Sequence, residues 1–301
     1  MITLNTDKGL IRVESWLDIQ GRPNFIADLN PAEHTLERII GRYAFKDKIP
    51  CGLSNCRTPH AKGYIVVTKG GPETNIGKDC GKTYFGVDFE TLSRTFDRDI
   101  TEKENRETLW SFSFRLEELK SKIRELRSGA HGADWIYKTT RSLIDINRGC
   151  PQEVVDRISA MVKARRNILT IERKATDAEV EAREAISGQR VHRPQYIDEP
   201  IATINGLEAL YPENDLREML VLDLESRIKQ FESVDIDTLA YDSLRQWVKW
   251  VGTVETTMEQ ANNIIAHGRR LLQAHNLSPF TRVLSQKDLT VFRNFLKGLS
   301  Q

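Results

Sequence analysis

The amino-acid sequence predicts an α+β fold that is predominantly α-helical. The first hundred residues hold ten of the 18 glycines and five of the 10 prolines, which separate short apolar runs typical of strands. From Thr101 onward, apolar residues recur at helical spacings. The stretch 187–200 has a glycine, two prolines and no periodicity, which is typical of a linker or long loop. We therefore expect a small α+β module over residues 1–100, a helical hairpin or bundle over 101–186, and a C-terminal helical domain over 201–301.

Short strands and two helices are expected in the N-terminal module, and one of these helices covers residues 89–96, a few residues after Cys80. The runs 10–19 and 63–71 are typical of strands, and the second enters a turn at Gly70-Gly71. A short helix is expected to begin after Asn30, with Pro31 in its first position, and to continue to Tyr43.

The helical body begins with a regular apolar repeat. Thr101 and Glu104 match a capping box, and Gly129 is a typical C-terminal stop. Between them, six apolar residues follow at spacings of 3, 4, 3, 4 and 3, namely Leu109, Phe112, Leu116, Leu119, Ile123 and Leu126. This is a heptad pattern, as in a coiled coil, but it is too short for a long autonomous one. We expect one continuous helix over 101–127 with this seam buried in a helical hairpin or bundle.

Further helices are expected along the rest of the chain. One covers residues 133–147 and is stopped by Gly149, and the next opens with Pro151 and carries a broad apolar face as far as Ile168. Amphipathic patterns predict three more helices, over residues 216–234, 239–272 and 285–299.

The overall composition argues against several classes of protein. The 44 basic and 43 acidic residues leave a formal charge of +1, which is unlike a polybasic protein. The first residues lack the apolar core of a secretory signal, and no apolar run approaches the roughly 20 residues that span a bilayer. Four cysteines do not make a disulfide framework. We expect a cytoplasmic protein with no membrane partner.

Glycine, lysine and cysteine gather in residues 74–86, "TNIGKDCGKTYFG". A phosphate-binding P-loop needs four residues between its two glycines, followed by Lys and then Ser or Thr. The interval from Gly71 to Gly77 is one residue too long, and the interval from Gly77 to Gly81 is one residue too short. Loop geometry depends on this count, so we exclude a P-loop here.

The cysteines of this region indicate a metal site instead. Three of the four cysteines fall within thirty residues, in the pattern Cys51-x4-Cys56-x3-His60 followed by Cys80. Three thiolates and one imidazole form a closed tetrahedral zinc site. We predict one structural Zn²⁺ bound by Cys51, Cys56, His60 and Cys80. In one alternative, the cysteines are ordinary core residues and His60 lies on the surface. In another, the metal site exists but His34 replaces His60 as the fourth ligand.

The order of the expected elements also carries a resemblance. A turn between two cysteines, a hairpin and a ligand near a helix start resemble a treble-clef zinc finger, over roughly residues 51–96 only. The sequence departs from the common form of that family, which takes two ligands from the helix end, because Cys80 is the one candidate there. Independently of the resemblance, Arg57, Lys78 and Lys82 lie close by in sequence and would offset the charge of three thiolates.

Basic residues gather on two of the predicted helices. A stripe that could contact nucleic-acid phosphates would comprise Lys120, Lys122, Arg124, Lys163, Arg165 and Arg166. In the alternative, these are solvated helix faces that pair with neighbouring acidic residues.

No set of catalytic residues is recognisable. The remaining histidines are scattered singly, and Cys150, at a helix junction, has no obvious histidine partner. We therefore expect a non-enzymatic protein that binds nucleic acid or a protein partner through its helical body. Two alternatives stay open: a nucleic-acid-processing enzyme whose zinc finger positions the substrate, and a structural protein that forms homo-oligomers through its helices.

Overall fold

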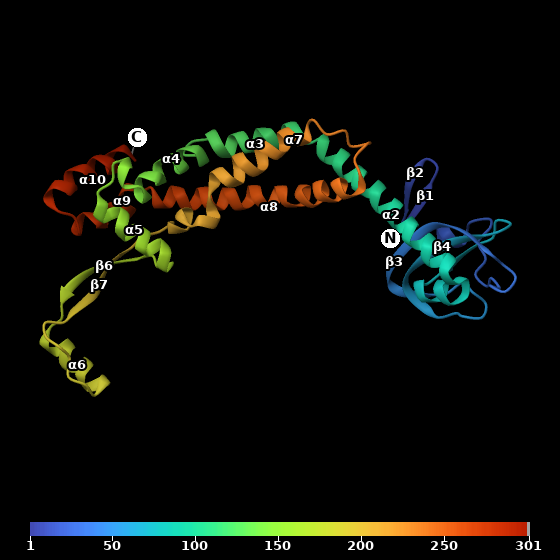
Figure 1. Ribbon diagram of the computed structural model, residues 1–301, viewed down its shortest axis with the longest axis horizontal. Coiled ribbons are helices and arrows are strands. Elements are labelled where there is room, and N and C mark those ends of the chain that lie inside the picture. Colours follow the sequence, from blue (N-terminus) through green and yellow to red (C-terminus); the bar gives the residue numbers. More distant parts are fainter. Residues whose placement is uncertain (300–301) are drawn as a thin grey trace. The chain divides into compact units, whose positions relative to one another are not determined.

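The computed structural model describes residues 1–299 and divides into two compact units (Figure 1). Unit 1 comprises residues 1–112 together with 235–249, and unit 2 comprises residues 113–234 and the chain from Trp250 onward. Unit 1 contains the larger sheet and unit 2 is almost entirely helical, so the expected α+β, predominantly α fold is confirmed. The finer division into four segments stays a prediction.

Unit 1 is built on a five-stranded antiparallel sheet with the strand order β2-β1-β3-β4-β5. Its strands are β1 (Ile2–Thr6), β2 (Gly9–Val13), β3 (Leu36–Pro50), β4 (Pro59–Thr68) and β5 (Glu73–Ile76). Helix α1 (Trp16–Gln20) packs through Ile19 into a cluster with Tyr43 and Ile65. A second cluster joins the sheet to helix α2 (Lys78–Ser113) through Val66, Ile76 and Phe89. Apolar side chains therefore cover both faces of the sheet.

Two sequence predictions in unit 1 need correction. Residues 31–43 do not form the expected helix, because Leu36 begins the long strand β3, which pairs with β4 along most of its length. Pairing with the next strand, β4, and with β1 here outweighs the local helical pattern. The run 10–19 is strand only as far as Val13. Ser15 then caps α1 by accepting a hydrogen bond from the amide of Leu17 at 3.2 Å.

Helix α2 begins well before the predicted capping box. Thr101 lies inside it, and its hydroxyl donates to the carbonyl of Asp97 at 2.7 Å instead of capping a helix start. Apolar residues before Thr101, such as Phe89 and Phe96, pack against the sheet, and this packing stabilises the helix from an earlier start. Gly86 interrupts α2 with φ 59° and ψ −141°, a backbone conformation that side chains disfavour.

The expected continuous helix over 101–127 is wrong for a second reason. α2 ends at Ser113 and α3 (Leu116–Ser128) begins three residues later. α3 ends before Gly129, as predicted. Four residues of the predicted seam are buried, namely Leu109, Phe112, Leu119 and Ile123. The seam is thus core of this chain, but it is divided between two helices.

Unit 2 begins with a run of short helices close to those expected. α4 (Ala133–Ile144) and the 3₁₀ turn η1 (Ile146–Arg148) precede Gly149, and α5 (Gln152–Ala164) follows Pro151.

Ion pairs connect helix α3 to later parts of the unit. Arg127 pairs with Glu225 at 2.5 Å, and Arg115 pairs with Glu255 at 2.5 Å.

The segment after α5 forms a strand-helix-strand arm (Figure 1). β6 (Ile168–Lys174) and β7 (Tyr196–Thr203) pair as a two-stranded antiparallel sheet, with α6 (Asp177–Ser187) between them in sequence. Ile168 therefore belongs to a strand instead of the preceding helix. The second part of the stretch 187–200, expected as a linker or loop, is strand β7.

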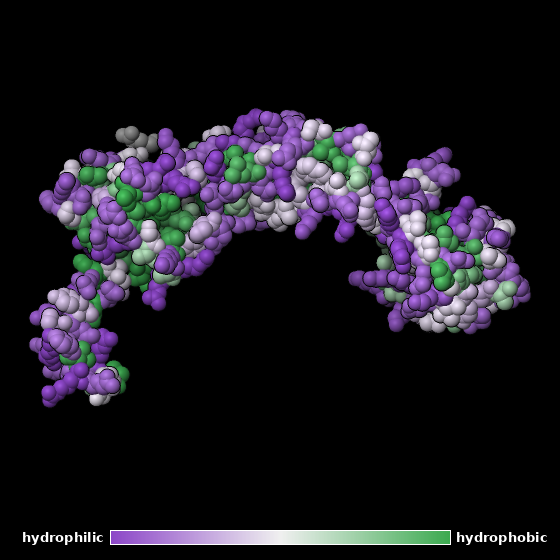
Figure 2. Space-filling model, in the orientation of Figure 1, coloured by the Kyte–Doolittle hydropathy of each residue, from purple (hydrophilic) through white to green (hydrophobic). Residues whose placement is uncertain are grey.

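The remaining elements of the chain are helical. They are η2 (Leu207–Leu210), η3 (Pro212–Asn214), the π-helix η4 (Glu218–Glu225), α7 (Ser226–Phe231), α8 (Tyr241–Leu271), α9 (Ala274–Leu277), η5 (Ser278–Arg282) and α10 (Gln286–Gly298). On the face shown in Figure 2, hydrophilic residues dominate the long helices and hydrophobic residues gather near α5. Among the helices of residues 1–299, none has both the length and the apolar character needed to cross a membrane.

Candidate metal centre

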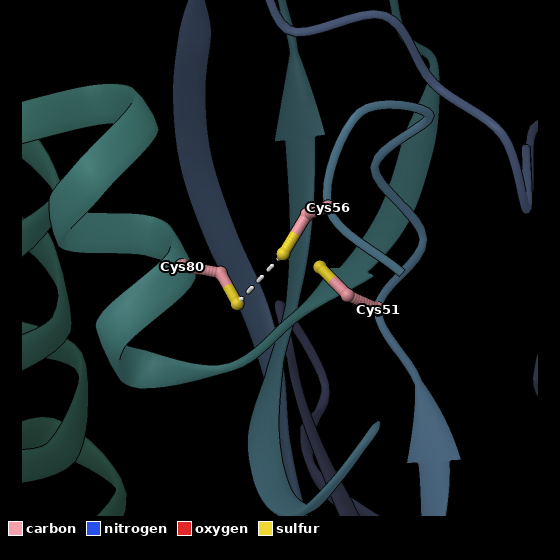
Figure 3. Close-up of side chains that lie close together, drawn as sticks. All are labelled: Cys51, Cys56 and Cys80. Atoms are coloured by element: carbon pink, nitrogen blue, oxygen red, sulfur yellow. Dashed lines mark hydrogen bonds between the residues drawn. The ribbon is translucent and has the colours of Figure 1, made fainter. Parts of the chain in front are cut away.

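Three cysteine side chains converge where β3, the β4–β5 hairpin and α2 meet (Figure 3). Cys51 directly follows β3, and Cys56 closes the turn that leads into β4. Cys80 lies in the first turn of α2, just after β5. The ligand atoms therefore come from two chain segments that the hairpin folds back onto each other. Within residues 1–299, this is the one group of three or more potential metal-ligating side chains that lie close together.

The sulfur positions suit a single tetrahedral metal ion. All three sulfur atoms lie within 4.8 Å of one another, and Cys56 Sγ is 3.3 Å from Cys80 Sγ. With Zn–S bonds of about 2.3 Å, tetrahedral geometry separates two sulfurs by about 3.8 Å. None of the cysteines is in a disulfide. Three thiols in this arrangement are a donor set that favours zinc or another soft metal.

Backbone hydrogen bonds hold the turn that carries Cys51 and Cys56. The amide of Cys51 donates to the carbonyl of Thr58 at 3.1 Å, and the amide of Cys56 donates to that of Leu53 at 3.2 Å. Leu53 is completely buried and anchors the turn in the core of unit 1. The segment at Leu29 pairs with the turn, because the amide of Leu29 donates to the carbonyl of Gly52 at 2.9 Å. The two thiols are thus presented by a rigid turn.

A close packing contact fixes the helix turn that carries Cys80. Gly81 lies against the ring of Phe89, and a β-carbon at Gly81 would lie 2.4 Å from that ring. Phe89 is completely buried, so its ring has little room to move. Glycine at position 81 therefore allows the start of α2 to approach the core closely enough for Cys80 to meet the other two cysteines.

His60 is not brought into this cluster. Its Nε2 forms a hydrogen bond with the hydroxyl of Tyr43, and its Nδ1 lies 3.0 Å from the carbonyl of Thr58. The Tyr43 hydroxyl also accepts from the side-chain amide of Asn75 at 3.4 Å. Both ring nitrogens therefore already have partners, and His60 joins β3, β4 and β5 through a polar network. Its role as fourth metal ligand stays a prediction, as does that of His34, which lies between a turn and the start of β3.

The three thiols differ in acidity. Burial raises the pKa of Cys51, and burial together with the hydrogen bond to Cys56 raises the pKa of Cys80 to about 12. Burial also opposes ionisation of Cys56, but its hydrogen bonds with the hydroxyl and backbone of Thr58 outweigh that effect and lower its pKa to about 7. Cys56 is thus the first of the three to become a thiolate and the natural point of attachment for an incoming cation.

Tyr84 lies beside the cluster and was missed in the sequence. Its hydroxyl donates to the carbonyl of Asn55 in the cysteine turn at 3.3 Å. Its pKa is raised by burial and by the neighbouring thiols of Cys56 and Cys80. The spacing of four residues from Cys80, one helical turn, is the sequence signal that could have identified it.

Two of the three cations expected to offset the thiolate charge have other partners. Arg57 donates to the carbonyl of Ala27 at 2.8 Å, and Lys82 pairs with Glu90 at 3.0 Å. Lys78 is exposed and makes no ion pair within the part of the chain that the structure describes. The fourth cysteine, Cys150, is buried in unit 2, and burial raises the pKa of its thiol to about 12, which suits an inert core residue.

Half of the predicted phosphate-contacting stripe is engaged with acidic groups. Lys120 pairs with Glu117 at 2.9 Å and also with Glu232, and Lys122 pairs with Glu118 at 2.6 Å. Arg165 pairs with Glu213 at 2.7 Å and lies over the ring of Tyr211. The other members, Arg124, Lys163 and Arg166, are exposed and make no ion pair among residues 1–299. Nucleic-acid binding by this stripe stays a prediction.

Comparison of the chain with protein-family models, with curated proteins and with solved structures finds no match.

Proposed function

We propose that this chain is a non-enzymatic nucleic-acid-binding protein whose unit 1 is stabilised by one structural zinc ion. The convergence of Cys51, Cys56 and Cys80 supports this proposal most strongly. A turn with two cysteines, the β4–β5 hairpin and Cys80 in the first turn of α2 follow in the order typical of a treble clef. A structural zinc ion needs a fourth ligand, and His60 could supply it by giving up its hydrogen bond to Tyr43.

The metal part of the proposal is tested by elemental analysis of protein purified without chelator. We expect one zinc per chain, and less than a tenth of that in the Cys56→Ser variant. X-ray absorption of the zinc-loaded protein should count three sulfur neighbours at about 2.3 Å and one nitrogen at about 2.0–2.1 Å. Loss of the nitrogen neighbour in His60→Ala would assign the fourth ligand. A metal-free wild-type protein would remove the basis of the proposal.

The nucleic-acid part is tested separately with zinc-loaded protein. Fluorescence anisotropy on a labelled single strand and a labelled duplex should show binding that weakens steeply as salt rises, since phosphate contacts release counterions. Intact nucleic acid after long incubation is the expected result for a binding protein, and turnover would favour the nucleic-acid-processing alternative.

A protein partner is the second candidate, and the arm formed by β6, α6 and β7 favours it. Ile186 on α6 is 89% exposed, and Ile168 and Tyr196 on the two strands are also exposed. Apolar side chains that stand out into solvent are typical of interaction surfaces. Deletion of residues 177–187 should abolish capture of such a partner while leaving zinc content and nucleic-acid binding unchanged.

A further inference from the structure

We propose that the nucleic-acid contact lies on unit 1, in a hollow where arginines of α2 and α8 gather around Tyr241. The inference rests on the proposed function, because it names the surface through which nucleic acid would bind. This surface belongs to unit 1, whereas the stripe predicted from the sequence belongs to unit 2. Its three cations are Arg94 and Arg98 on α2 and Arg245 on α8, all exposed.

One tyrosine ring orders two of these arginines. The guanidinium carbon of Arg98 lies 5.0 Å from the centre of the Tyr241 ring, and that of Arg245 lies 5.9 Å from it. Stacking on an aromatic ring reduces the entropy that a guanidinium loses on binding an anion, and it leaves the N–H groups at the edge free to donate. The two guanidinium groups are therefore already arranged to donate hydrogen bonds to two oxygens of one oxyanion, such as phosphate.

Arg94 and Arg98 line a concave surface, and none of the three arginines has an acidic partner among the described residues. The hollow has a volume of about 570 Å³, and its lining includes Arg94, Arg98 and Tyr241. Within residues 1–299, neither these two arginines nor Arg245 makes an ion pair, in contrast to Lys120 and Arg165 of the predicted stripe. Their charge is thus available to a ligand.

Two carboxylates also face this hollow, Asp97 and Asp242. Asp97 is already engaged, because it accepts a hydrogen bond from the hydroxyl of Tyr64 at 2.7 Å and lies 3.8 Å from Arg42. Asp242 is exposed and has no ion pair among the described residues. Among the lining residues that the structure describes, Asp242 is therefore the one carboxylate without an ion-pair partner, against two arginines without one, and Arg245 adds a third cation beside the Tyr241 ring.

A second hollow continues the cationic surface. It has a volume of about 470 Å³ and shares Asp97 with the first. Its lining includes Lys62 and Lys78, which are exposed and make no ion pair in the described part of the chain. Two adjacent hollows with free cations suit a ligand whose negative charges repeat at regular intervals. A phosphodiester chain has this property, and single strands bind in such tracks.

The experiment compares zinc-loaded full-length variants that carry the same change in charge. Arg94→Glu with Arg98→Glu alters the hollow, and Lys163→Glu with Arg166→Glu alters free cations of the predicted stripe. Each is titrated against a labelled single strand of about 30 nucleotides and a duplex of similar length, from about 50 to 200 mM salt. We expect the first variant to bind at least tenfold more weakly at low salt. Its log–log salt slope should fall by roughly two phosphate contacts, each worth about 0.9 on the duplex and about 0.7 on the single strand, whereas the control variant should keep the wild-type slope.

The tyrosine supplies a second, milder test. Tyr241→Phe keeps the ring and should bind as the wild type does, whereas Tyr241→Leu removes the support of both arginines and should weaken binding severalfold. Arg94→Gln with Arg98→Gln replaces the charge-reversed variant if that one loses zinc or fails to fold.

The outcomes distinguish the proposed function, nucleic-acid binding, from the proposed location of the contact on unit 1. A wild-type protein that binds neither oligonucleotide at low salt contradicts the proposed function and this inference with it. Binding that survives in the α2 variant but is lost in the stripe variant keeps the function and overturns the inference. Competition by poly-glutamate as strong as that by nucleic acid would also overturn it, because the surface would then recognise acidic protein.

Discussion

The two units of this protein hold their shape by different means. Unit 2 is stabilised by apolar helix faces, with Leu119, Ile136 and Leu220 fully or almost fully buried. Unit 1 covers both faces of a small sheet with modest clusters and has its three clustered cysteines at the end of that sheet. A small core often needs a metal ion to complete its stability. If unit 1 binds zinc as proposed, we expect its stability to depend on that ion and the stability of unit 2 to be independent of it.

The largest expected effect is metal removal, which would sharpen this comparison. Structural zinc contributes roughly 10–16 kcal/mol of apparent binding energy in small modules, so chelation should unfold unit 1 around the cysteines. We expect hydrogen exchange to show lost protection in β3 to β5 and unchanged protection in α3 to α5. Cys51→Ser should reproduce this pattern. Cys150→Ser, the same change at a buried cysteine of unit 2, should retain zinc, and equal loss of protection in both units would refute the distinction.

Core truncation in unit 2 should produce the next largest effect. Leu119→Ala empties a fully buried position of α3 and should lower the free energy of unfolding by roughly 2–5 kcal/mol. Leu116, three residues earlier and only partly buried, provides the matched control, and its truncation should cost less. Urea denaturation of both variants checks the order, and zinc content should stay at the wild-type value in each.

The pH dependence of zinc binding follows from the three thiol pKa values. Above pH 7 the Cys56 thiol is largely ionised, since its pKa is about 7, whereas the raised pKa values of Cys51 and Cys80 keep both protonated. Zinc must then displace about two protons, so its dissociation constant should rise about 100-fold for each pH unit lost between 8.5 and 7.5. Below pH 7 a third proton competes and the rise should steepen. Competition with a chromophoric chelator measures the slope, and a pH-independent constant would exclude thiolate ligation.

The smallest expected effect tests how the Cys80 turn is positioned. Gly81→Ala places a methyl group against the buried ring of Phe89 and should cost roughly 1–3 kcal/mol, read as weaker zinc affinity and a lower Tm. Gly252, inside α8, has open space where a β-carbon would go. Gly252→Ala should therefore stabilise the protein by up to about 1 kcal/mol. Similar effects from both substitutions would mean that the Phe89 contact does not limit the approach of the helix.

Local signals predicted unit 2 better than unit 1. Gly149 and Pro151 mark the junction between α4 and α5 close to its actual place, because helix ends are determined by neighbouring residues. The helix expected over residues 31–43 is instead the first part of strand β3, because pairing with β1 and β4, and not the local apolar pattern, decides its conformation. The helix expected over residues 89–96 begins earlier than predicted, at Lys78, because contacts of α2 with the sheet, such as those of Phe89, extend it.

The cysteine cluster was predictable from spacing, but the surroundings of the charges were not. Two cysteines around a tight turn and a third beyond a hairpin converge whenever the hairpin forms, and the structure brings all three together. The hydrogen-bond and ion-pair partners of His60 and Lys120 could not be predicted from sequence spacing. Tyr43 lies on a different strand from His60, and Glu232 lies 112 residues from Lys120. Ion pairs of this kind appear only when distant segments are in place.

The π-helix η4 has a consequence for how the chain tolerates changes in length. In a π-helix each hydrogen bond spans one residue more than in an α-helix, so the stretch Glu218–Glu225 holds surplus backbone. Removal of exposed Leu222 would convert part of it to the tighter geometry and leave the buried face of α7 in register. The same deletion within α8 would turn all following side chains by about 100° and misplace the core. Among the helices of residues 1–299, the π-helix is therefore one in which the loss of a residue can be absorbed without misplacing the core that follows.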